Sequence, residues 1–334
     1  MNEKRKISAL SIVLQPKNHE KAIALTDWLA ELSPFPVWIP LMKSHGVIKA
    51  IAVLPTSEAY PSLLEALFQR MRYKTLIEFQ NICYEITGIE IKNYELYLLE
   101  ISIFPNDILP STLGRAIHAL CFQWLANASP NLAKDVHNRE YSPITVAIKP
   151  KAQQMAMTLK IGLLQGELLA PLLWGMSRDI GNEISITGVT CRLGNEIKIC
   201  QTSSFKDLMQ IAPQKKICLE FLSPTSFKQK QTIQPFPLPQ LVFSNLWRRW
   251  NNSAPPELQL PPVEWQILTS EFEIKTFAMK MKGGAEIGTK GWVKYHFLQD
   301  EQAKIATILA HFATFAGIGR KTAMGMGQVK LIQS

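Results

Sequence analysis

The last third of the chain alternates strand and helix patterns in an order that few folds can accommodate. Six patterns follow one another, at residues 216–224, 239–250, 270–278, 290–297, 301–315 and 328–332. The second and fifth repeat apolar residues at helical spacing, and the other four are extended runs of the kind that forms strands. The resulting order, β-α-β-β-α-β, is typical of the split-βαβ, ferredoxin-like arrangement.

The middle third repeats this order in a looser form. A strand at 95–105 closes on a proline and leads into a helix with a clear apolar stripe, and a short helix that opens after Ser129 ends near His137. Further strands are predicted at 143–149, 155–163, 183–190 and 195–200, the last two as a hairpin. A duplicated ferredoxin-like core is the simplest architecture for the two regions together.

The first 93 residues form a small unit of their own, without a catalytic signature. Strands are predicted at 7–14 and 47–54, helices at 19–32 and about 60–72, and a hairpin at 75–84 and 87–92. We therefore expect an α+β protein in three parts. These are an accessory α/β module at 1–93, a first ferredoxin-like domain at 94–217 with the candidate catalytic histidine, and a second at 218–334 with a glycine-rich loop.

Charge and cysteine content narrow the class of protein. Lysine and arginine number 36 against 27 for aspartate and glutamate, a formal net charge of +9 over 334 residues. Residues 218–334 hold 13 basic and 8 acidic side chains, hence +5 of that excess, which favours a polyanionic partner. Five scattered cysteines without a C-x-x-C pair argue against a disulfide scaffold or a zinc cluster. No apolar run reaches the roughly 20 residues of a membrane span, so we expect a soluble, cytoplasmic protein.

The most informative stretch is the glycine-rich loop, GIGRKTAMGMG at 317–327. Two adjacent cations, Arg320 and Lys321, stand among four glycines, which are Gly317, Gly319, Gly325 and Gly327. Glycines let a backbone approach an anion closely, and the cations add positive charge beside it. A P-loop needs a strand before it and a helix after it, and here that order is reversed. The alternative is a turn that only links a helix to a strand.

This loop and four further motifs resemble the CRISPR-associated endoribonucleases that cut precursor CRISPR RNA within its repeats, members of the RAMP superfamily. The other motifs are LGRAIH at 113–118, SPNLAKDVH at 129–137, FLSPTSF at 221–227, and PLP at 237–239 leading to Phe243 and Trp250. Each is modest alone, and together in this order they are specific. The resemblance covers about residues 94–334 and leaves the N-terminal module outside.

The resemblance implies tandem ferredoxin-like domains and RNA cleavage without metal or other cofactor. The ribose 2′-hydroxyl would attack the scissile phosphate and leave a 2′,3′-cyclic phosphate and a 5′-hydroxyl. Expected partners are CRISPR repeat RNA, as precursor and mature guide, with subunits of an effector complex as a further option. The alternatives are a non-catalytic RAMP subunit that binds or caps guide RNA, and a general RNA-binding protein.

The resemblance also assigns candidate catalytic residues. His137 falls at the place of the family's catalytic histidine, and an imidazole suits proton transfer near neutral pH. Some relatives have a tyrosine one helix earlier, where this chain has Phe122, and a lysine soon after the histidine. Arg139 and Tyr141 are the nearby substitutes, although Arg139 can equally be a solvated charge and Tyr141 a residue at the core edge. His118 and His311 are expected to pack.

RNA phosphates are expected to contact the glycine-rich loop and a few other cations. The predicted contacts are Arg115, Arg248, Arg249, Gly317, Gly319, Arg320, Lys321, Thr322, Gly325 and Gly327. Arg248 and Arg249 are predicted on the wetter side of their helix, where they either extend the RNA surface or are simply solvated.

Overall fold

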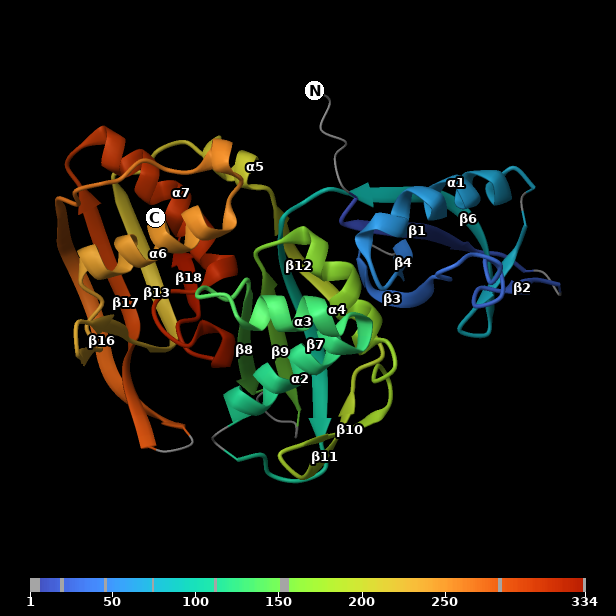
Figure 1. The fold of residues 1–334 in the computed structure, drawn as a ribbon, viewed down its shortest axis with the longest axis horizontal. Helices are drawn as coiled ribbons and strands as arrows, with labels where there is room; N and C mark the ends of the chain where they lie inside the picture. The colour runs from blue at the N-terminus through green and yellow to red at the C-terminus, as the bar shows by residue number, and fades with distance from the viewer. Residues whose placement is uncertain are drawn as a thin grey trace.

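The structure, a computed structural model, describes residues 7–18, 21–44, 47–73, 75–110, 113–150, 156–281 and 284–332. Three large sheets lie side by side along the long axis of the molecule (Figure 1), with the N-terminal module at the right and the C-terminal domain at the left. The middle domain lies between them and contacts both. In the described ranges no helix is long and apolar enough to cross a membrane.

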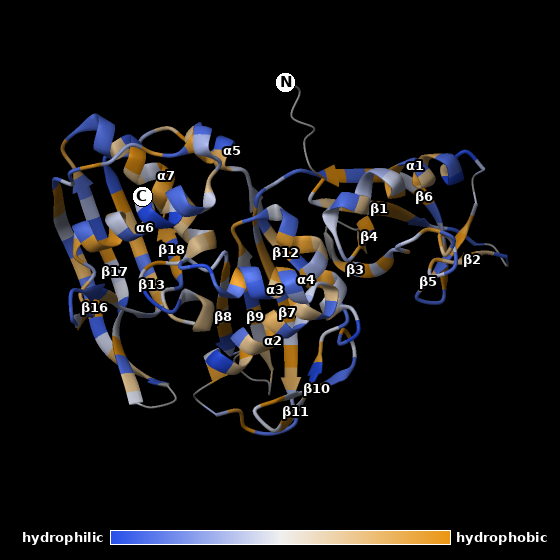
Figure 2. Cartoon of the chain, in the orientation of Figure 1, coloured by the Kyte–Doolittle hydropathy of each residue, from blue (hydrophilic) through white to orange (hydrophobic). Residues whose placement is uncertain are grey.

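The C-terminal domain has the predicted order of elements. They are β13 (Lys216–Thr225), α6 (Pro239–Ser253), β16 (Ile267–Met281), β17 (Gly284–Phe297), α7 (Asp300–Ala316) and β18 (Val329–Ile332). The strands form an antiparallel sheet in the order β16-β17-β13-β18, which is a ferredoxin-like sheet. A small hairpin of β14 (Phe227–Gln229) and β15 (Thr232–Gln234) follows β13. The apolar faces of α6 and α7 pack on one side of the sheet, and Figure 2 shows hydrophobic segments along β13.

The middle domain is the looser version of the same fold. Its elements are β7 (Leu96–Pro105), α2 (Leu113–Ala128), α3 (Pro130–His137), β8 (Ile144–Pro150), β9 (Met157–Leu163), α4 (Leu169–Met176), β10 (Glu183–Ile186), β11 (Val189–Leu193), β12 (Lys198–Ser203) and α5 (Phe205–Met209). The sheet runs β10-β11-β7-β9-β8, and β12 also pairs with β7. Because β11 and β12 take the two ends of β7, they share the place of the fourth strand. The predicted α+β class with tandem ferredoxin-like domains is confirmed.

The N-terminal module is a six-stranded sheet with one long helix. Its elements are β1 (Ala9–Pro16), β2 (Ile23–Ala24), β3 (Val37–Ser44), β4 (Val47–Val53), α1 (Tyr60–Met71), β5 (Ile77–Phe79) and β6 (Ile82–Lys92), and the sheet order is β2-β5-β6-β1-β4-β3. Residues on one face of β1 and β4, such as Leu10 and Ala52, pack under α1. Residues of the other face, such as Ala9, Ile51 and Val53, join the core of the middle domain.

Several predicted elements were wrong in detail. The predicted helix at 19–32 is not formed, because residues 23–24 pair with β5 and the following residues make turns that bury Leu25 and Trp28; residues 19–20 lie outside the described part. The predicted hairpin at 75–84 and 87–92 turns instead at Gln80 and Asn81. The hairpin predicted from 183–190 and 195–200 turns at 187–188 and joins β10 to β11, while β12 pairs elsewhere. Both turns place two residues at positive φ, the geometry of a tight two-residue hairpin loop.

The middle and C-terminal domains meet along a seam where backbone approaches backbone. A Cβ atom built on Gly114, in the first turn of α2, would lie 1.9 Å from the carbonyl oxygen of Met324 in the glycine-rich loop. The Thr145 hydroxyl on β8 donates a 2.7 Å hydrogen bond to the Phe315 carbonyl at the end of α7. A Cβ on Gly162 of β9 would lie 2.5 Å from that same carbonyl oxygen. These contacts fix the glycine-rich loop against the start of α2.

Replacing Gly114 with alanine is expected to destabilise the protein by roughly 1–3 kcal/mol, the range typical of overpacking, or more, because the new methyl meets backbone that cannot rotate away. In an isolated helix the same change would stabilise, since alanine has the higher helix propensity. Thermal unfolding of Gly114→Ala measures the effect. Gly88→Ala is the matched control, because its Cβ would meet only Val13 at an ordinary 3.7 Å. Equal melting temperatures for the two variants would contradict the tight seam.

Candidate active site

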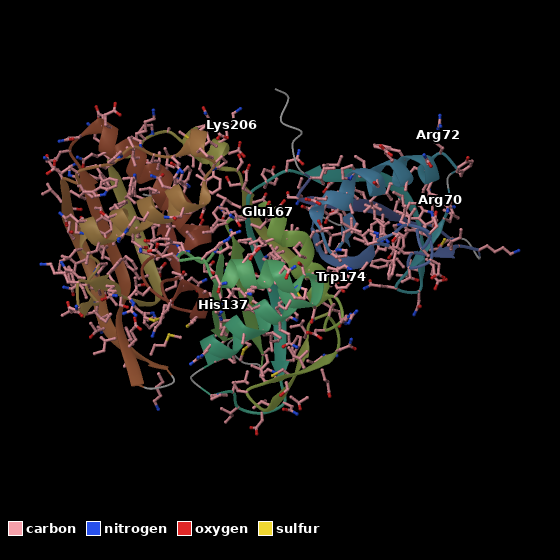
Figure 3. All side chains as sticks on the ribbon, viewed as in Figure 1. Arg70, Arg72, His137, Glu167, Trp174 and Lys206 are labelled. Carbon is pink, nitrogen blue, oxygen red and sulfur yellow. The ribbon has the colours of Figure 1, made fainter. Side chains whose placement is uncertain are left out.

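His137 is the last residue of α3, a short helix with a well-defined start. Ser129 caps it by accepting a 3.3 Å hydrogen bond from the Leu132 N–H, and Pro130 takes the first helical position, where its missing N–H costs nothing. Ala133 and Val136 are buried against the middle domain, whereas the His137 side chain is exposed. Figure 3 places His137 on the side of the middle domain that faces the C-terminal domain.

Three rings gather at this point. The ring of His118 on α2 lies 6.2 Å from that of His137, measured between centroids, and Phe122 lies 4.6 Å from His118 and 5.3 Å from His137. His118 and Phe122 are four residues apart and therefore share one face of α2. His118 was predicted only to pack, and its contact with His137 was not predicted. The available signal was its spacing of four residues from Phe122, the position at which a catalytic tyrosine was sought.

The environment of His118 favours a neutral imidazole. Burial lowers the pKa of His118, and the nearby His137 and Arg115 lower it further, since all three effects disfavour a second positive charge. A neutral imidazole has one nitrogen free to accept a proton. His118 therefore suits the role of a general base, and the exposed His137 lies close to it.

Arg139 and Tyr141 follow His137 but do not touch it. The Arg139 guanidinium donates a 2.6 Å hydrogen bond from Nη1 to Oε1 of Gln165. Tyr141 is partly buried. Among the residues that the structure describes, neither makes a hydrogen bond or ring contact with His137. Their place in catalysis stays a prediction.

The glycine-rich loop is packed more tightly than a free anion cradle. Gly317, Gly319, Gly325 and Gly327 all have positive φ, which explains why glycine stands at each position. The N–H of Gly319 donates to Oδ1 of Asn245 on α6 at 2.8 Å, and the N–H of Gly327 donates to the Pro224 carbonyl at 3.1 Å. The N–H of Gly317 closes α7. The backbone N–H groups of Gly317, Gly319 and Gly327 therefore already have partners within the chain, and contact of the loop with RNA stays a prediction. Thr322 is buried at 4% exposure.

A buried carboxylate holds the two cations of the loop. Glu286 on β17 is 8% exposed and accepts from the Ser226 hydroxyl at 2.7 Å and from Lys321 Nζ at 2.5 Å, with Arg320 Nη1 at 3.7 Å. Burial alone would raise the pKa of Glu286, but the hydrogen bonds from Lys321 and Ser226 and the two positive charges outweigh it and lower that pKa. Arg320 and Lys321 each keep about a third of their side-chain surface exposed, so they present charge to solvent from a fixed position.

The remaining predicted cations differ in exposure. Arg115 is exposed beside Gly114 on α2, and Arg248 is exposed on α6 with its Nε bonded to the Ser244 carbonyl at 3.3 Å. Arg249 is 5% exposed, so its predicted position on the wetter side of α6 is wrong. Counting from Val242, positions 242, 246 and 249 follow the i, i+4, i+7 spacing of one buried face, and only Arg248 points away from it.

The seam brings the loop and the imidazoles together. Gly114, which contacts Met324, lies four residues before His118 and eight before Phe122, so the three share one face of α2. One helical turn rises 5.4 Å, and His137 adjoins the second of these turns. The glycine-rich loop, through Met324, and the two histidines therefore adjoin successive turns of the same face of α2.

Glu286→Gln is expected to lower the free energy of unfolding at pH 7 by roughly 1–3 kcal/mol, because Lys321 and Arg320 lose the negative charge of their buried partner. A carboxyl with a lowered folded pKa stabilises above its unfolded pKa, near 4.5, and that stabilisation is lost as pH falls through the folded value. The difference between the two proteins should therefore narrow steadily on acidification below 4.5, as measured by denaturant unfolding across pH. Glu257→Gln, at an exposed position, serves as the control. A gap that stays constant down to acid pH would contradict the assigned role of Glu286.

Comparison with known proteins gives one family match and several similar folds. Residues 219–329 match the sequence model of a family described as CRISPR-associated endoribonuclease Cas6. The fold is similar to that of Cas6 (TTHB231) in a product complex, at 22% identity and a TM-score of 0.64 over 72% of this chain and all of that one. The same protein, from Thermus thermophilus, also matches in a second structure at 21% identity and a TM-score of 0.56, over 72% of this chain and all of that one. Cas6 (TTHA0078) in a product complex matches at 22% identity and a TM-score of 0.57 over 71% and 100%. A search of curated proteins gave no match.

Proposed function

We propose that this chain, whose residues 219–329 match the Cas6 family model, is an endoribonuclease that processes CRISPR RNA. The observation that carries the proposal is the pair of imidazoles, His118 and His137, beside the cation-bearing loop. Repeat RNA is the proposed substrate, as precursor and as retained guide, with effector-complex subunits as further partners.

We further propose a reaction without metal. His118, held neutral, accepts the proton of the ribose 2′-hydroxyl, whose oxygen forms a bond to phosphorus. The bond from phosphorus to the 5′-oxygen breaks, and protonated His137 donates a proton to that oxygen. The products are a 2′,3′-cyclic phosphate and a 5′-hydroxyl. Two rings 6.2 Å apart suit this division of roles, because the attacking and leaving oxygens lie on opposite sides of one phosphorus.

The negative charge that builds on the phosphate needs nearby cations. Arg115 lies one residue after Gly114 on α2, and Lys321 and Arg320 lie across the seam. Preorganised charge of this kind stabilises a transition state, since no reorganisation is needed during the reaction. Glu286 supplies that order by fixing Lys321 and Arg320 before RNA arrives. Arg139 and Tyr141 stay the proposed catalytic partners of His137 on the same RNA.

His137→Ala and His118→Ala are each expected to slow cleavage of repeat RNA by roughly 10²–10⁴-fold while affinity changes little. The double variant should lose less than the product of the two, because the histidines act as a unit. His118 as the base also predicts that the wild-type rate falls as pH drops below its lowered pKa, and that this acid limb disappears in His118→Ala. Single-turnover cleavage in EDTA across pH measures both effects. His296→Ala, far away on β17, is the control, and an unaltered rate in His137→Ala would refute the assignment.

Replacing Arg320 and Lys321 together by glutamine is expected to weaken RNA binding and to flatten its salt dependence. Each phosphate contact that is lost lowers the slope of log affinity against log salt by about 0.7 for single-stranded RNA. Binding is measured in the His137→Ala background, so that the RNA stays intact. An unchanged slope would show that these cations serve only Glu286.

A second function is favoured by one observation. Phe122, at the centre of the ring group, cannot transfer a proton. A non-catalytic RAMP subunit that binds or caps guide RNA would have the same fold and loop. Repeat RNA that stays intact in EDTA but is bound by the wild-type protein would support this alternative over the endoribonuclease.

A further inference from the structure

Arg249 is a buried cation with no counterion among the residues that the structure describes. Its side chain lies on the inner face of α6 and is 5% exposed. Both Nε and Nη2 are enclosed and make no hydrogen bond to the described residues. None of the carboxylates that the structure describes forms a salt bridge with it. A buried guanidinium in this state is costly, because it has left water without gaining a partner.

The surroundings of Arg249 place it at the seam. Asn245, one turn earlier on the same helix, holds the N–H of Gly319 in the glycine-rich loop. Tyr141, a few residues after His137, is the titratable neighbour that acts on the pKa of Arg249. Burial lowers the pKa of Arg249 to about 10, and Tyr141 acts in the opposite direction. Arg249 thus lies between the loop of the C-terminal domain and the segment that follows the candidate catalytic helix.

Among the described residues, the buried carboxylate of the C-terminal domain does not satisfy Arg249. Glu286, the buried carboxylate of this region, is already bound by Ser226 and Lys321. A planar guanidinium with several free donors matches the paired oxygens of a phosphodiester. An anion that enters with a ligand fits the site better than a structural partner within the chain.

We propose that Arg249 binds a backbone phosphate of RNA lodged between the two ferredoxin-like domains. This inference rests on the proposed function and adds one specific contact to it. Because only 5% of the side chain is exposed, RNA must displace a neighbouring group to reach it, and the partly buried Tyr141 is the neighbour at hand. The free protein thus keeps an unpaired charge that bound RNA neutralises.

Arg249→Met separates a ligand contact from a structural one. Removing an unpaired buried charge should leave the unfolding temperature of the RNA-free protein at least as high as before, whereas removing a structural partner would lower it. Affinity for repeat RNA, measured in the His137→Ala background, should fall roughly tenfold or more, with a salt slope smaller by about 0.7. Arg72→Gln, an exposed position at the end of α1 (Figure 3), controls for net charge.

An Arg249→Met protein with unaltered affinity and salt slope would overturn the inference, as would an equal loss in Arg72→Gln. Should the methionine variant fail to fold, Arg249→Lys keeps the charge and removes the fork, and it should still lose affinity severalfold; full affinity in that variant would equally overturn the inference. The binding measurement does not depend on cleavage. Failure of wild-type protein to cut repeat RNA therefore counts against the proposed function alone.

Discussion

The close approach of Gly114 to the Met324 carbonyl is the contact on which the candidate site depends. It leaves no room for a side chain, and it joins the first turn of α2 to the glycine-rich loop of the other domain. Since His118 and Phe122 extend along the same face of α2, this single contact sets how far the loop stands from the imidazoles. Thr145 and Gly162 hold the end of α7 on the same side of the seam, so the two domains are positioned by backbone rather than by long side chains.

Charge in the site is arranged before any ligand is present. Glu286 orients two loop cations, while Arg249 is left without such a partner. The loop cations and Arg249 differ in whether a carboxylate binds them among the described residues. Cations that a buried carboxylate holds in place need no rearrangement when an anion binds. An unpaired buried guanidinium carries a desolvation penalty that a bound anion would offset.

The regular elements of the two ferredoxin-like domains were predictable because their apolar periodicity is strong. The failures have local causes. Residues 19–32 contain enough apolar positions for a helix, yet pairing with β5 and burial of Trp28 override the pattern. One hairpin was shifted because its tight turn places Gln80 and Asn81 at positive φ, with no glycine or proline to mark it. The turn of the other hairpin contains Gly188, a signal that the prediction did not use.

The site was only partly predictable, because its contacts join residues far apart in the chain. His137 was found through a motif, but its approach to His118 depends on how α3 folds back on α2. The ion pair of Lys321 and Glu286 joins the glycine-rich loop to β17, and no local sequence pattern predicts it. Arg248 and Arg249 are adjacent in the sequence, and the spacing of Arg249 from Val242 was the available signal that it is the buried one.

The N-terminal sheet is packed on both faces. One face of the sheet packs on α1 and the other on the middle domain, so both faces are held in place. At the edge of the sheet, the Ile197 N–H donates a 3.3 Å hydrogen bond to the Pro40 carbonyl. A molecule bound at the distal end of this module would therefore be held in a fixed orientation relative to the imidazoles.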